Sequence, residues 1–326
     1  MRVLIIGGTG LISSAIVTGL VANGHQVTTL NRGSSPPIDD RVQTILCDRR
    51  DRESFIEAIA GQRRFDVAID MVAYHPEDAH ADVLALGNRV DRMIFCSTVE
   101  VYTKPESELP IKIGHPTHPI TDYGRAKREC ETLLFAAQSA GVFSLTILRP
   151  AYTYGEGRPL LYALGDARYP AVIGEGWPVV VPSDGNAAWV ACHRDDVATA
   201  FVSSVERQCS AGRVYNVAGS TPMTWNEYHR SVARILGRTD LDLLHLPSSY
   251  LRDRFAGFAD REHIFVHNYW FNCSEAELDL GWKPRISFDD GAERALTWLA
   301  HHQFRSQALE PLELELARSW SQSQAR

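Results

Sequence analysis

The sequence predicts an α/β fold in which a doubly wound, mostly parallel sheet precedes a smaller, mixed C-terminal lobe. Over the first 150 residues, short apolar runs alternate with segments of helical periodicity, at the spacing of strand–helix–strand units. The first run, residues 3–8 ("VLIIGG"), ends in glycines, as expected for a buried strand that enters a tight turn. After Pro150 the alternation stops, and residues 153–186 are rich in Gly, Pro, Tyr and Trp.

The expected elements follow in order along the chain. Short apolar runs indicate strands at 3–8, 26–33, 42–48, 65–74, within 90–102 and at 143–152. Helical spacing that ends near a glycine indicates helices at 11–25, 53–62 and 123–141. Beyond these we expect a strand and then a helix within 189–206, a strand at 212–219, and helices at 224–236 and 273–284. The polar tail at 319–326 is expected to fray.

Composition excludes several classes of function. The chain has 326 residues, 44% of them hydrophobic, and a formal net charge of −7 without a long block of one sign. This pattern speaks against a nucleic-acid-binding face and against a basic helix on a membrane surface. Six scattered cysteines indicate free thiols rather than a disulfide framework or a metal site. Glycines interrupt the apolar N-terminus, which argues against a signal peptide, so we expect a cytoplasmic protein.

A glycine-rich turn follows the first strand. Gly7, Gly10 and Ser13 have G-x-x-G-x-x-S spacing and open the first helix. Backbone N–H groups at such a helix N-terminus can bind a pyrophosphate. We therefore divide the chain into a dinucleotide-binding Rossmann domain at 1–152, to which 187–218 returns, and a mainly substrate-binding lobe at 153–326. The residues of the turn expected to contact the cofactor are Gly7, Thr9, Gly10, Leu11 and Ile12.

The ends of the second and third strands bear on the choice between NAD and NADP. An acidic residue after the second strand would accept from the adenosine ribose, whereas Arg32 can meet a 2′-phosphate. Asn31, Arg32 and Ser34 therefore favour NADP over NAD. Asp48, at the end of the third strand and followed by Arg49, is a candidate partner for the adenine or a helix cap.

Tyr123 and Lys127 stand four positions apart at the start of a predicted helix, so that they share one face. Oxidation of a secondary alcohol needs a group that takes up the hydroxyl proton. A nearby ammonium group lowers the pKa of a tyrosine and suits it to that role. Ser97 and Thr98, at the end of the fifth strand, offer a hydroxyl that would position the substrate oxygen.

Seven motifs together resemble the extended short-chain dehydrogenases/reductases, the NAD(P)-dependent sugar epimerase/dehydratase group. They are "GGTGLIS", Asp48, "STVEVY", "YGRAK", "LRPAYTYGEG", "HRDDVA" and "LGWKP", and they span nearly the whole chain. The resemblance implies Thr98 as the hydroxyl that positions substrate, Tyr123 as base, and Lys127 as its partner and a ligand of the nicotinamide ribose. It places Val72, Ala73, Pro150 and Ala151 along the cofactor. The expected substrate contacts are Tyr74, Thr98, Tyr152, Arg158 and His193. A homodimer through the helix of Tyr123 and its predecessor is the expectation for this family.

Two residues in "STVEVY" bear on the reaction. Glu100 resembles the glutamate of members that act at C5 of a 4-keto sugar, where a carboxylate can take a proton from carbon. Val99 stands where the common hexose 4,6-dehydratases have an acid. The resemblance therefore supports C5 or dehydratase-like chemistry at Glu100, and Val99 argues against standard 4,6-dehydration. A structural role for Glu100 remains the alternative.

The leading hypothesis is a nucleotide-sugar epimerase or dehydratase that oxidises a sugar hydroxyl, acts on the keto intermediate and returns the hydride. One alternative is a ketoreductase that consumes NADPH. Another is a non-enzymatic member, since some atypical relatives similar in "LNRG" bind RNA or act as regulators. The acidic net charge and the intact Thr98, Tyr123 and Lys127 speak against the last of these.

Overall fold

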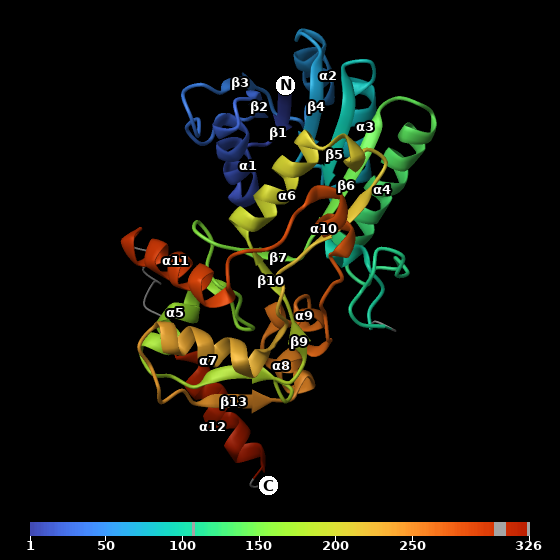
Figure 1. Cartoon of the computed structure of the whole chain (residues 1–326). Helices are drawn as coiled ribbons and strands as arrows, with labels where there is room; N and C mark the ends of the chain where they lie inside the picture. Colours follow the sequence, from blue (N-terminus) through green and yellow to red (C-terminus); the bar gives the residue numbers. More distant parts are fainter. Residues whose placement is uncertain (106–107, 303–310, 325–326) are drawn as a thin grey trace.

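The computed structural model describes residues 1–105, 108–302 and 311–324, and the statements below concern those residues. A seven-stranded parallel sheet with the strand order β11-β6-β5-β4-β1-β2-β3 forms the larger part of the molecule (Figure 1). Its strands are β1 (Arg2–Ile6), β2 (Gln26–Asn31), β3 (Gln43–Leu46), β4 (Phe65–Asp70), β5 (Val90–Cys96), β6 (Ser144–Pro150) and β11 (Val214–Val217). The order runs outward from β1 in both directions, which confirms the predicted doubly wound sheet.

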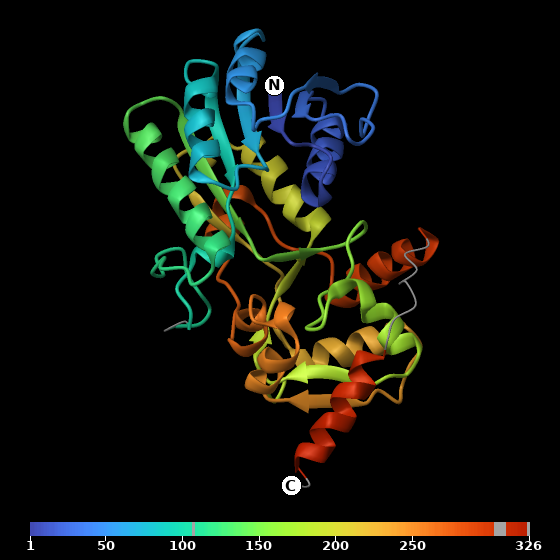
Figure 2. The same ribbon diagram turned by 180° about the vertical axis from the view of Figure 1, so that it is seen from behind.

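Helices cover both faces of this sheet. α1 (Leu11–Ala22) and α6 (Arg194–Glu206) pack on one face, where they bury Val3 and Ile5 of β1. α2 (Arg52–Ala60), α3 (Pro76–Leu86) and α4 (Asp122–Ser139) pack on the other face, over Leu4 and Ile6 (Figure 2). These four side chains of β1 (residues 3–6) are fully buried, because successive residues of a strand point to opposite faces and both faces are covered.

The smaller lobe has a mixed architecture around an aromatic core. Its short strands pair as β8 (Val179–Pro182) with β13 (Leu243–Leu246) and β9 (Ala188–Trp189) with β12 (Met223–Thr224). Its helices are α5 (Tyr169–Gly174), α7 (Trp225–Ile235), α8 (Ser248–Arg254), α9 (Glu262–Val266), α11 (Phe288–His301) and α12 (Leu312–Gln324). Trp189 stacks on Trp225 with ring centroids 4.3 Å apart, and both side chains are buried.

The chain crosses between the two parts more than once. β7 (Tyr152–Tyr154) pairs in parallel with β10 (Ala191–His193), and together these strands bridge the sheet and the smaller lobe (Figure 1). The segment at 187–218 supplies α6 and β11 to the large sheet. α10 (Ser274–Leu280) also packs on the sheet side, where Trp282 is buried. Four short 3₁₀ helices complete the fold: Val99–Val101, Asp166–Arg168, Gln208–Ser210 and Ala256–Phe258.

Several helices were not predicted from the pattern. β4 ends at Asp70 rather than at residue 74, and α3 begins soon after it with Pro76 in its first turn. α11 was also missed. The expected frayed tail is wrong as far as Gln324, since residues 312–324 form α12 and bury Glu313 and Leu316. Among the described helices, none has the length and apolarity needed to cross a membrane.

Candidate active site

A cavity of about 750 Å³ lies where the parallel strands of the sheet end, between the sheet and the smaller lobe. This is the position at which doubly wound sheets bind ligands. It brings together most of the residues that the sequence singled out. These are Gly7, Thr9, Gly10, Leu11, Ile12, Val72, Tyr74, Thr98, Glu100, Tyr123, Lys127, Pro150, Ala151, Tyr152 and Arg158.

The glycine turn has a backbone that excludes larger side chains. Gly7 and Gly8 have φ values of +112° and +103°, in the region that favours glycine. A Cβ on Gly8 would lie 2.5 Å from Cγ2 of Thr29, and one on Gly7 would lie 3.2 Å from Cγ1 of Val72. Gly10 is the N-cap of α1, and its N–H donates to Ser13 Oγ at 2.9 Å. The close approach of the backbone and the helix N-terminus fit a dinucleotide pyrophosphate.

Val72 and Ala73 are held in place by Asp70, the last residue of β4. Oδ1 of Asp70 accepts hydrogen bonds from the N–H groups of Val72 at 2.6 Å and Ala73 at 2.7 Å. The other oxygen of Asp70 binds the guanidinium of Arg49, which also donates to Asp82 at 3.0 Å. Arg49 was expected at the cofactor, but its side chain is 9% exposed and turned into this network. Its role is to anchor Asp70, and thereby the turn at Val72.

The adenosine end of the site carries several charges on the surface. Asp48 forms a two-pronged ion pair with Arg50, with its Oδ2 2.7 Å from Arg50 Nη2. The hydrogen bonds of Arg50 and the charge of Arg32 lower the pKa of Asp48 to about 2. Asn31 accepts from the N–H of Gly33 at 2.8 Å. Asn31 and Ser34 line a separate hollow beside β2 and β3, and the side chains of Arg32 and Asp48 lie outside the large cavity.

Helix α4 carries the Tyr123/Lys127 pair into the cavity. Thr121 caps it by accepting a hydrogen bond from the N–H of Gly124 at 3.0 Å. A Cβ on Gly124 would collide with the carbonyl oxygen of Glu100, so the glycine lets the helix approach the end of β5. Lys127 is 1% exposed, and its Nζ donates to the carbonyl oxygens of Ala73 at 2.9 Å and Cys96 at 2.6 Å. These two bonds leave the third N–H of the ammonium group for another acceptor.

The Tyr123 ring faces the cavity and is 45% exposed. Burial of its hydroxyl raises the pKa of Tyr123, while a hydrogen bond with Thr98 works in the opposite direction. Burial also lowers the pKa of Lys127. Thr98 and Tyr123 thus meet through their hydroxyl groups at the cavity, and their role in holding a substrate oxygen stays a prediction.

A buried ion pair between α4 and β6 holds the helix of Tyr123 and Lys127 against the sheet. Glu131 of α4 is fully buried and binds Arg149 of β6 through two bonds, at 2.8 Å and 2.7 Å. Ser97 donates its hydroxyl to the same carboxylate at 2.7 Å. Arg149 in turn donates to the hydroxyl of Tyr102 at 3.0 Å. Ser97 is therefore committed to the core, which leaves Thr98 as the hydroxyl that faces the cavity.

Glu100 contacts two basic side chains, Lys104 and His263. Its Oε1 lies 3.0 Å from Nζ of Lys104, and its Oε2 lies 3.2 Å from Nε2 of His263 on α9. Burial works to raise the pKa of Glu100, but the His263 hydrogen bond and the charge of Lys104 outweigh it and bring the pKa to about 2. This carboxylate is paired, whereas the resemblance implied a base. Val99 is buried, and its carbonyl accepts a hydrogen bond from the hydroxyl of Tyr269.

The far wall of the cavity is aromatic and comes mostly from the smaller lobe. Tyr152 packs edge-on against Trp189, with ring centroids 5.6 Å apart. The guanidinium of Arg158 lies 5.4 Å from the Tyr152 ring. Arg261 forms an ion pair with Asp166 beside it. Rings and scattered polar groups of this kind suit a sugar or a nucleotide.

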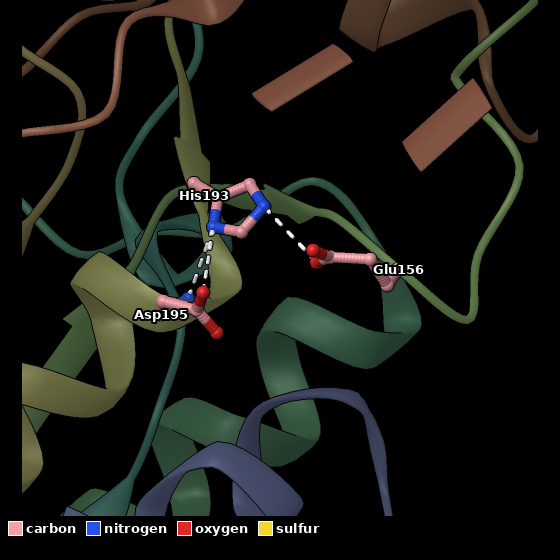
Figure 3. A group of neighbouring side chains, drawn as sticks. All are labelled: Glu156, His193 and Asp195. Atoms are coloured by element: carbon pink, nitrogen blue, oxygen red, sulfur yellow. Dashed lines mark hydrogen bonds and ion pairs between the residues drawn. The ribbon is translucent and has the colours of Figure 1, made fainter. Parts of the chain in front are cut away.

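His193 does not line the cavity, contrary to the expectation of a substrate contact. Its Nδ1 accepts from the N–H of Asp195 at 3.2 Å, and its Nε2 lies 3.3 Å from Oε2 of Glu156 (Figure 3). The three side chains are close enough to hold a metal ion. However, Arg294 of α11 contacts both carboxylates, at 2.7 Å for Glu156 and 2.6 Å for Asp195. The cluster is an ion-pair network that ties α11 to the start of α6.

Comparison with known proteins identifies the family. The model of the NAD dependent epimerase/dehydratase family matches residues 3–218. The chain belongs to this family. The glycine turn and the Tyr123/Lys127 pair of this chain fall within the matched region.

Relatives in the epimerase/dehydratase family carry diverse names. The chain is 28% identical to a 2'-dehydrokanamycin reductase of Streptomyces kanamyceticus, over 88% of this chain and 79% of that protein. It is 28% identical to the chloroplast stem-loop binding protein of 41 kDa b of Arabidopsis thaliana, over 89% and 77%. It is 26% identical to a UDP-glucose 4-epimerase of Azospirillum brasilense, over 91% of both chains.

Solved structures of the family share the fold. A UDP-glucuronic acid 4-epimerase of Bacillus cereus in complex with NAD superposes with a TM-score of 0.75 at 19% identity, covering 94% of this chain and 100% of that one. A UDP-glucose 4-epimerase of Thermotoga maritima superposes with a TM-score of 0.75 at 22% identity, covering 93% and 100%. The extended short-chain dehydrogenase/reductase resemblance is thereby confirmed.

Several cavity residues of this epimerase/dehydratase family member escaped sequence reasoning. Lys104, Asp166, Arg261 and His263 line the cavity but lie in loops and short helices without a periodic pattern. Lys104, four positions after Glu100, was the one with a local signal, because opposite charges at that spacing often pair. His263 had none, since it meets Glu100 only through the packing of α9.

Proposed function

We propose that this protein oxidises a hydroxyl group of a nucleotide sugar to a transient ketone, acts on the keto sugar, and returns the hydride. The observation that carries the proposal is the meeting of Thr98, Tyr123 and Lys127 in the same cavity as the glycine turn. A pyrophosphate site and a proton-handling hydroxyl pair in one cavity are what nicotinamide-dependent oxidation of an alcohol requires.

Each residue of this group has a distinct part. A bound nicotinamide would take the hydride from the sugar carbon and later return it. Thr98 orients the substrate oxygen through its hydroxyl, and Tyr123 takes up and gives back the hydroxyl proton. Lys127 is fixed by two carbonyl oxygens, and its remaining N–H is available to the ribose of the cofactor beside Tyr123. We assign to the Lys127 ammonium group the further part of favouring the phenolate form of Tyr123, against the burial that raises the pKa of this residue.

The nucleotide sugar as substrate is supported by the shape of the cavity and by the relatives. The cavity extends from the glycine turn past Tyr123 to the wall formed by Tyr152, Trp189 and Arg158, which leaves a polar and aromatic space beyond the cofactor positions. The names of the matched epimerases refer to UDP-sugars.

NADP is the cofactor that the adenosine end favours. Arg32 and Ser34 follow β2, where an acidic residue would reject a 2′-phosphate. Denaturing the purified protein and weighing the released cofactor would test this; NAD alone would contradict the preference for NADP. The expected homodimer through α3 and α4 stays a prediction, and Leu84 and Leu133 are exposed on these helices.

Tyr123→Phe tests the proposal directly. Loss of the phenolic hydroxyl should lower turnover of a responsive nucleotide sugar by about 10²- to 10⁴-fold, because a positioned acid–base group contributes roughly that factor. Tyr250→Phe is the matched control, since the Tyr250 hydroxyl is buried in the smaller lobe and has no hydrogen-bond partner among the residues that the structure describes. Equal turnover of Tyr123→Phe and wild type on a panel of UDP-, GDP- and dTDP-hexoses would refute the proposed function.

A ketoreductase is the second candidate. It is favoured by the reductase named among the relatives, which matches most of this chain. Both reactions use the same Tyr123 chemistry, so the distinction lies in the overall balance of electrons. A ketoreductase consumes one NADPH for each product formed, whereas an epimerase or dehydratase that returns its hydride consumes none. Following the absorbance of added NADPH during turnover separates the two.

A further inference from the structure

We propose that His263, held by Glu100, exchanges a proton with the substrate carbon next to the oxidised centre. The inference rests on the proposed function and concerns the step that follows oxidation. It assigns to the smaller lobe a catalytic residue at a place where the resemblance pointed to Glu100 of the Rossmann domain.

The contacts of Glu100 argue against a role as the base. Both of its oxygens are occupied, Oε1 by Lys104 at 3.0 Å and Oε2 by His263 at 3.2 Å. A carboxylate that is stabilised by an ammonium group and by an imidazole N–H is a weak base, because taking up a proton would weaken both interactions. Lys104 is 1% exposed and is further held over the Tyr269 ring at 3.8 Å, so this pairing is built into the core.

The contacts of His263 suit it to the role that Glu100 lacks. Its Nε2 faces the carboxylate of Glu100, which accepts hydrogen bonds and cannot donate one when ionised. The proton of the neutral imidazole therefore resides on Nε2, and Nδ1 carries a free lone pair. No hydrogen bond within the described part of the chain uses Nδ1 of His263. A base whose ring is oriented by a third group is the recurrent arrangement for proton transfer.

The position of the pair matches the carbon next to the oxidised one. His263 lines the same cavity as Thr98 and Tyr123, and its side chain is 14% exposed. Glu100 lies two residues beyond Thr98, and its N–H donates to the Thr98 hydroxyl at 3.2 Å. A sugar whose oxygen is held by Thr98 and Tyr123 therefore presents a neighbouring carbon towards the Glu100/His263 side.

The step balances without any added reagent. The ketone acidifies the adjacent C–H bond, and that bond breaks as its proton moves to Nδ1 of His263. The electron pair forms the carbon–carbon double bond of an enolate, whose oxygen is held by the hydroxyls of Thr98 and Tyr123. In the reverse direction the imidazolium returns a proton to the carbon. In a dehydration it instead protonates a hydroxyl on the next carbon, which leaves as water while the enolate electrons re-form the C=O bond and the product is an unsaturated ketone. The proton on His263 exchanges with solvent meanwhile.

Two readouts on the same samples test the inference. The full chain with its bound cofactor is mixed in D₂O with UDP-, GDP- and dTDP-hexoses. Absorbance of reduced nicotinamide reports the hydride step, and mass spectrometry of the recovered sugar reports deuterium bound to carbon. Wild type should show both signals. His263→Gln should keep the hydride step and lose about 10²- to 10⁴-fold in the rate of deuterium incorporation.

Three further variants define the outcome. Glu100→Gln should slow incorporation by a smaller factor, because it disorients the imidazole and leaves it in place. His80→Gln, an exposed histidine of α3, is the matched control and should behave as wild type. His263→Ala should regain incorporation when imidazole is added, which a merely structural role would not produce.

The results distinguish failure of the inference from failure of the proposed function. Hydride transfer without deuterium incorporation in wild type overturns the inference alone, as does unchanged incorporation in His263→Gln. Absence of the hydride step from wild type on every nucleotide sugar overturns the proposed function, and the inference falls with it.

Discussion

Glu131→Gln should destabilise the protein because it leaves the buried guanidinium of Arg149 without a counter-charge. The carboxylate of Glu131 is fully buried, and it binds Arg149 at 2.8 Å and 2.7 Å and the Ser97 hydroxyl at 2.7 Å. A glutamine amide would turn an N–H towards one of the guanidinium N–H groups. Arg149 is 4% exposed and would keep one bond to the glutamine oxygen and its bond to Tyr102, with no negative charge beside it.

The magnitude follows from the burial of the pair. Breaking a buried ion pair by removal of one partner costs about 3–5 kcal/mol of the free energy of unfolding. For a chain of this length, each kcal/mol lowers Tm by about 2 °C, so we expect a decrease of roughly 6–10 °C. Differential scanning calorimetry or thermal unfolding followed by circular dichroism would measure it.

Two further variants control this experiment. Glu129→Gln is the same substitution on the same helix at an exposed position, and it should change the free energy of unfolding by less than about 0.5 kcal/mol. Arg149→Met in the Glu131→Gln background should recover part of the lost stability, since it removes the unpaired charge. A Tm of Glu131→Gln equal to that of Glu129→Gln would refute the assignment of the ion pair.

Two other predictions follow from the site. Gly8→Ala should weaken NAD(P) binding and cost about 1–3 kcal/mol of stability, because its Cβ would lie 2.5 Å from Thr29 at a φ of +103°. Calorimetric titration with the cofactor measures the binding. Gly174→Ala is the control, since a Cβ at Gly174 meets open space. Burial opposes the shift of the Glu100 pKa, but the His263 hydrogen bond and the charge of Lys104 hold that pKa at about 2, below its unfolded value. The resulting stabilisation is present above about pH 4.5 and is lost as the pH falls towards 2. Between about pH 6 and about pH 3, the free energy of unfolding measured in urea should fall by about 2 kcal/mol more in wild type than in Glu100→Gln. An equal decrease in both proteins would contradict the pairing.

The parts of the fold that could be predicted are those with a local signal. The glycine turn, the strands around it and the helix of Tyr123 and Lys127 each rest on spacing within about twenty residues, which hydrophobic periodicity reports. α3 was missed because three of its five buried residues are alanines, Ala79, Ala81 and Ala85, which give a weak apolar stripe. Its first residue, Pro76, also follows the strand too closely to separate the two by pattern alone.

The errors at the site have a common physical cause. Arg49 follows a strand and resembles a loop arginine, yet its partners are Asp70 at the end of β4 and Asp82 on helix α3. The pairing of a charged side chain depends on which strands become neighbours, and strand order is not written in the local pattern. The same holds for His193 at the end of β10, whose partner Glu156 lies in the loop after β7.

The residues proposed for oxidation of the alcohol could be found from the sequence, whereas His263, proposed for the step on the resulting ketone, could not. Thr98, Tyr123 and Lys127 come from adjacent elements of one domain, so the motifs of the sequence alone marked them as candidates for the oxidation of an alcohol. The residues that would act on the resulting ketone are joined across the two lobes, where His263 of α9 reaches Glu100 after β5. A substitution in α9 that shifts His263 would leave the cofactor turn and the Tyr123 pair intact and still change the product. If His263 acts as proposed, the packing of the smaller lobe against the end of β5 sets the reaction that follows oxidation.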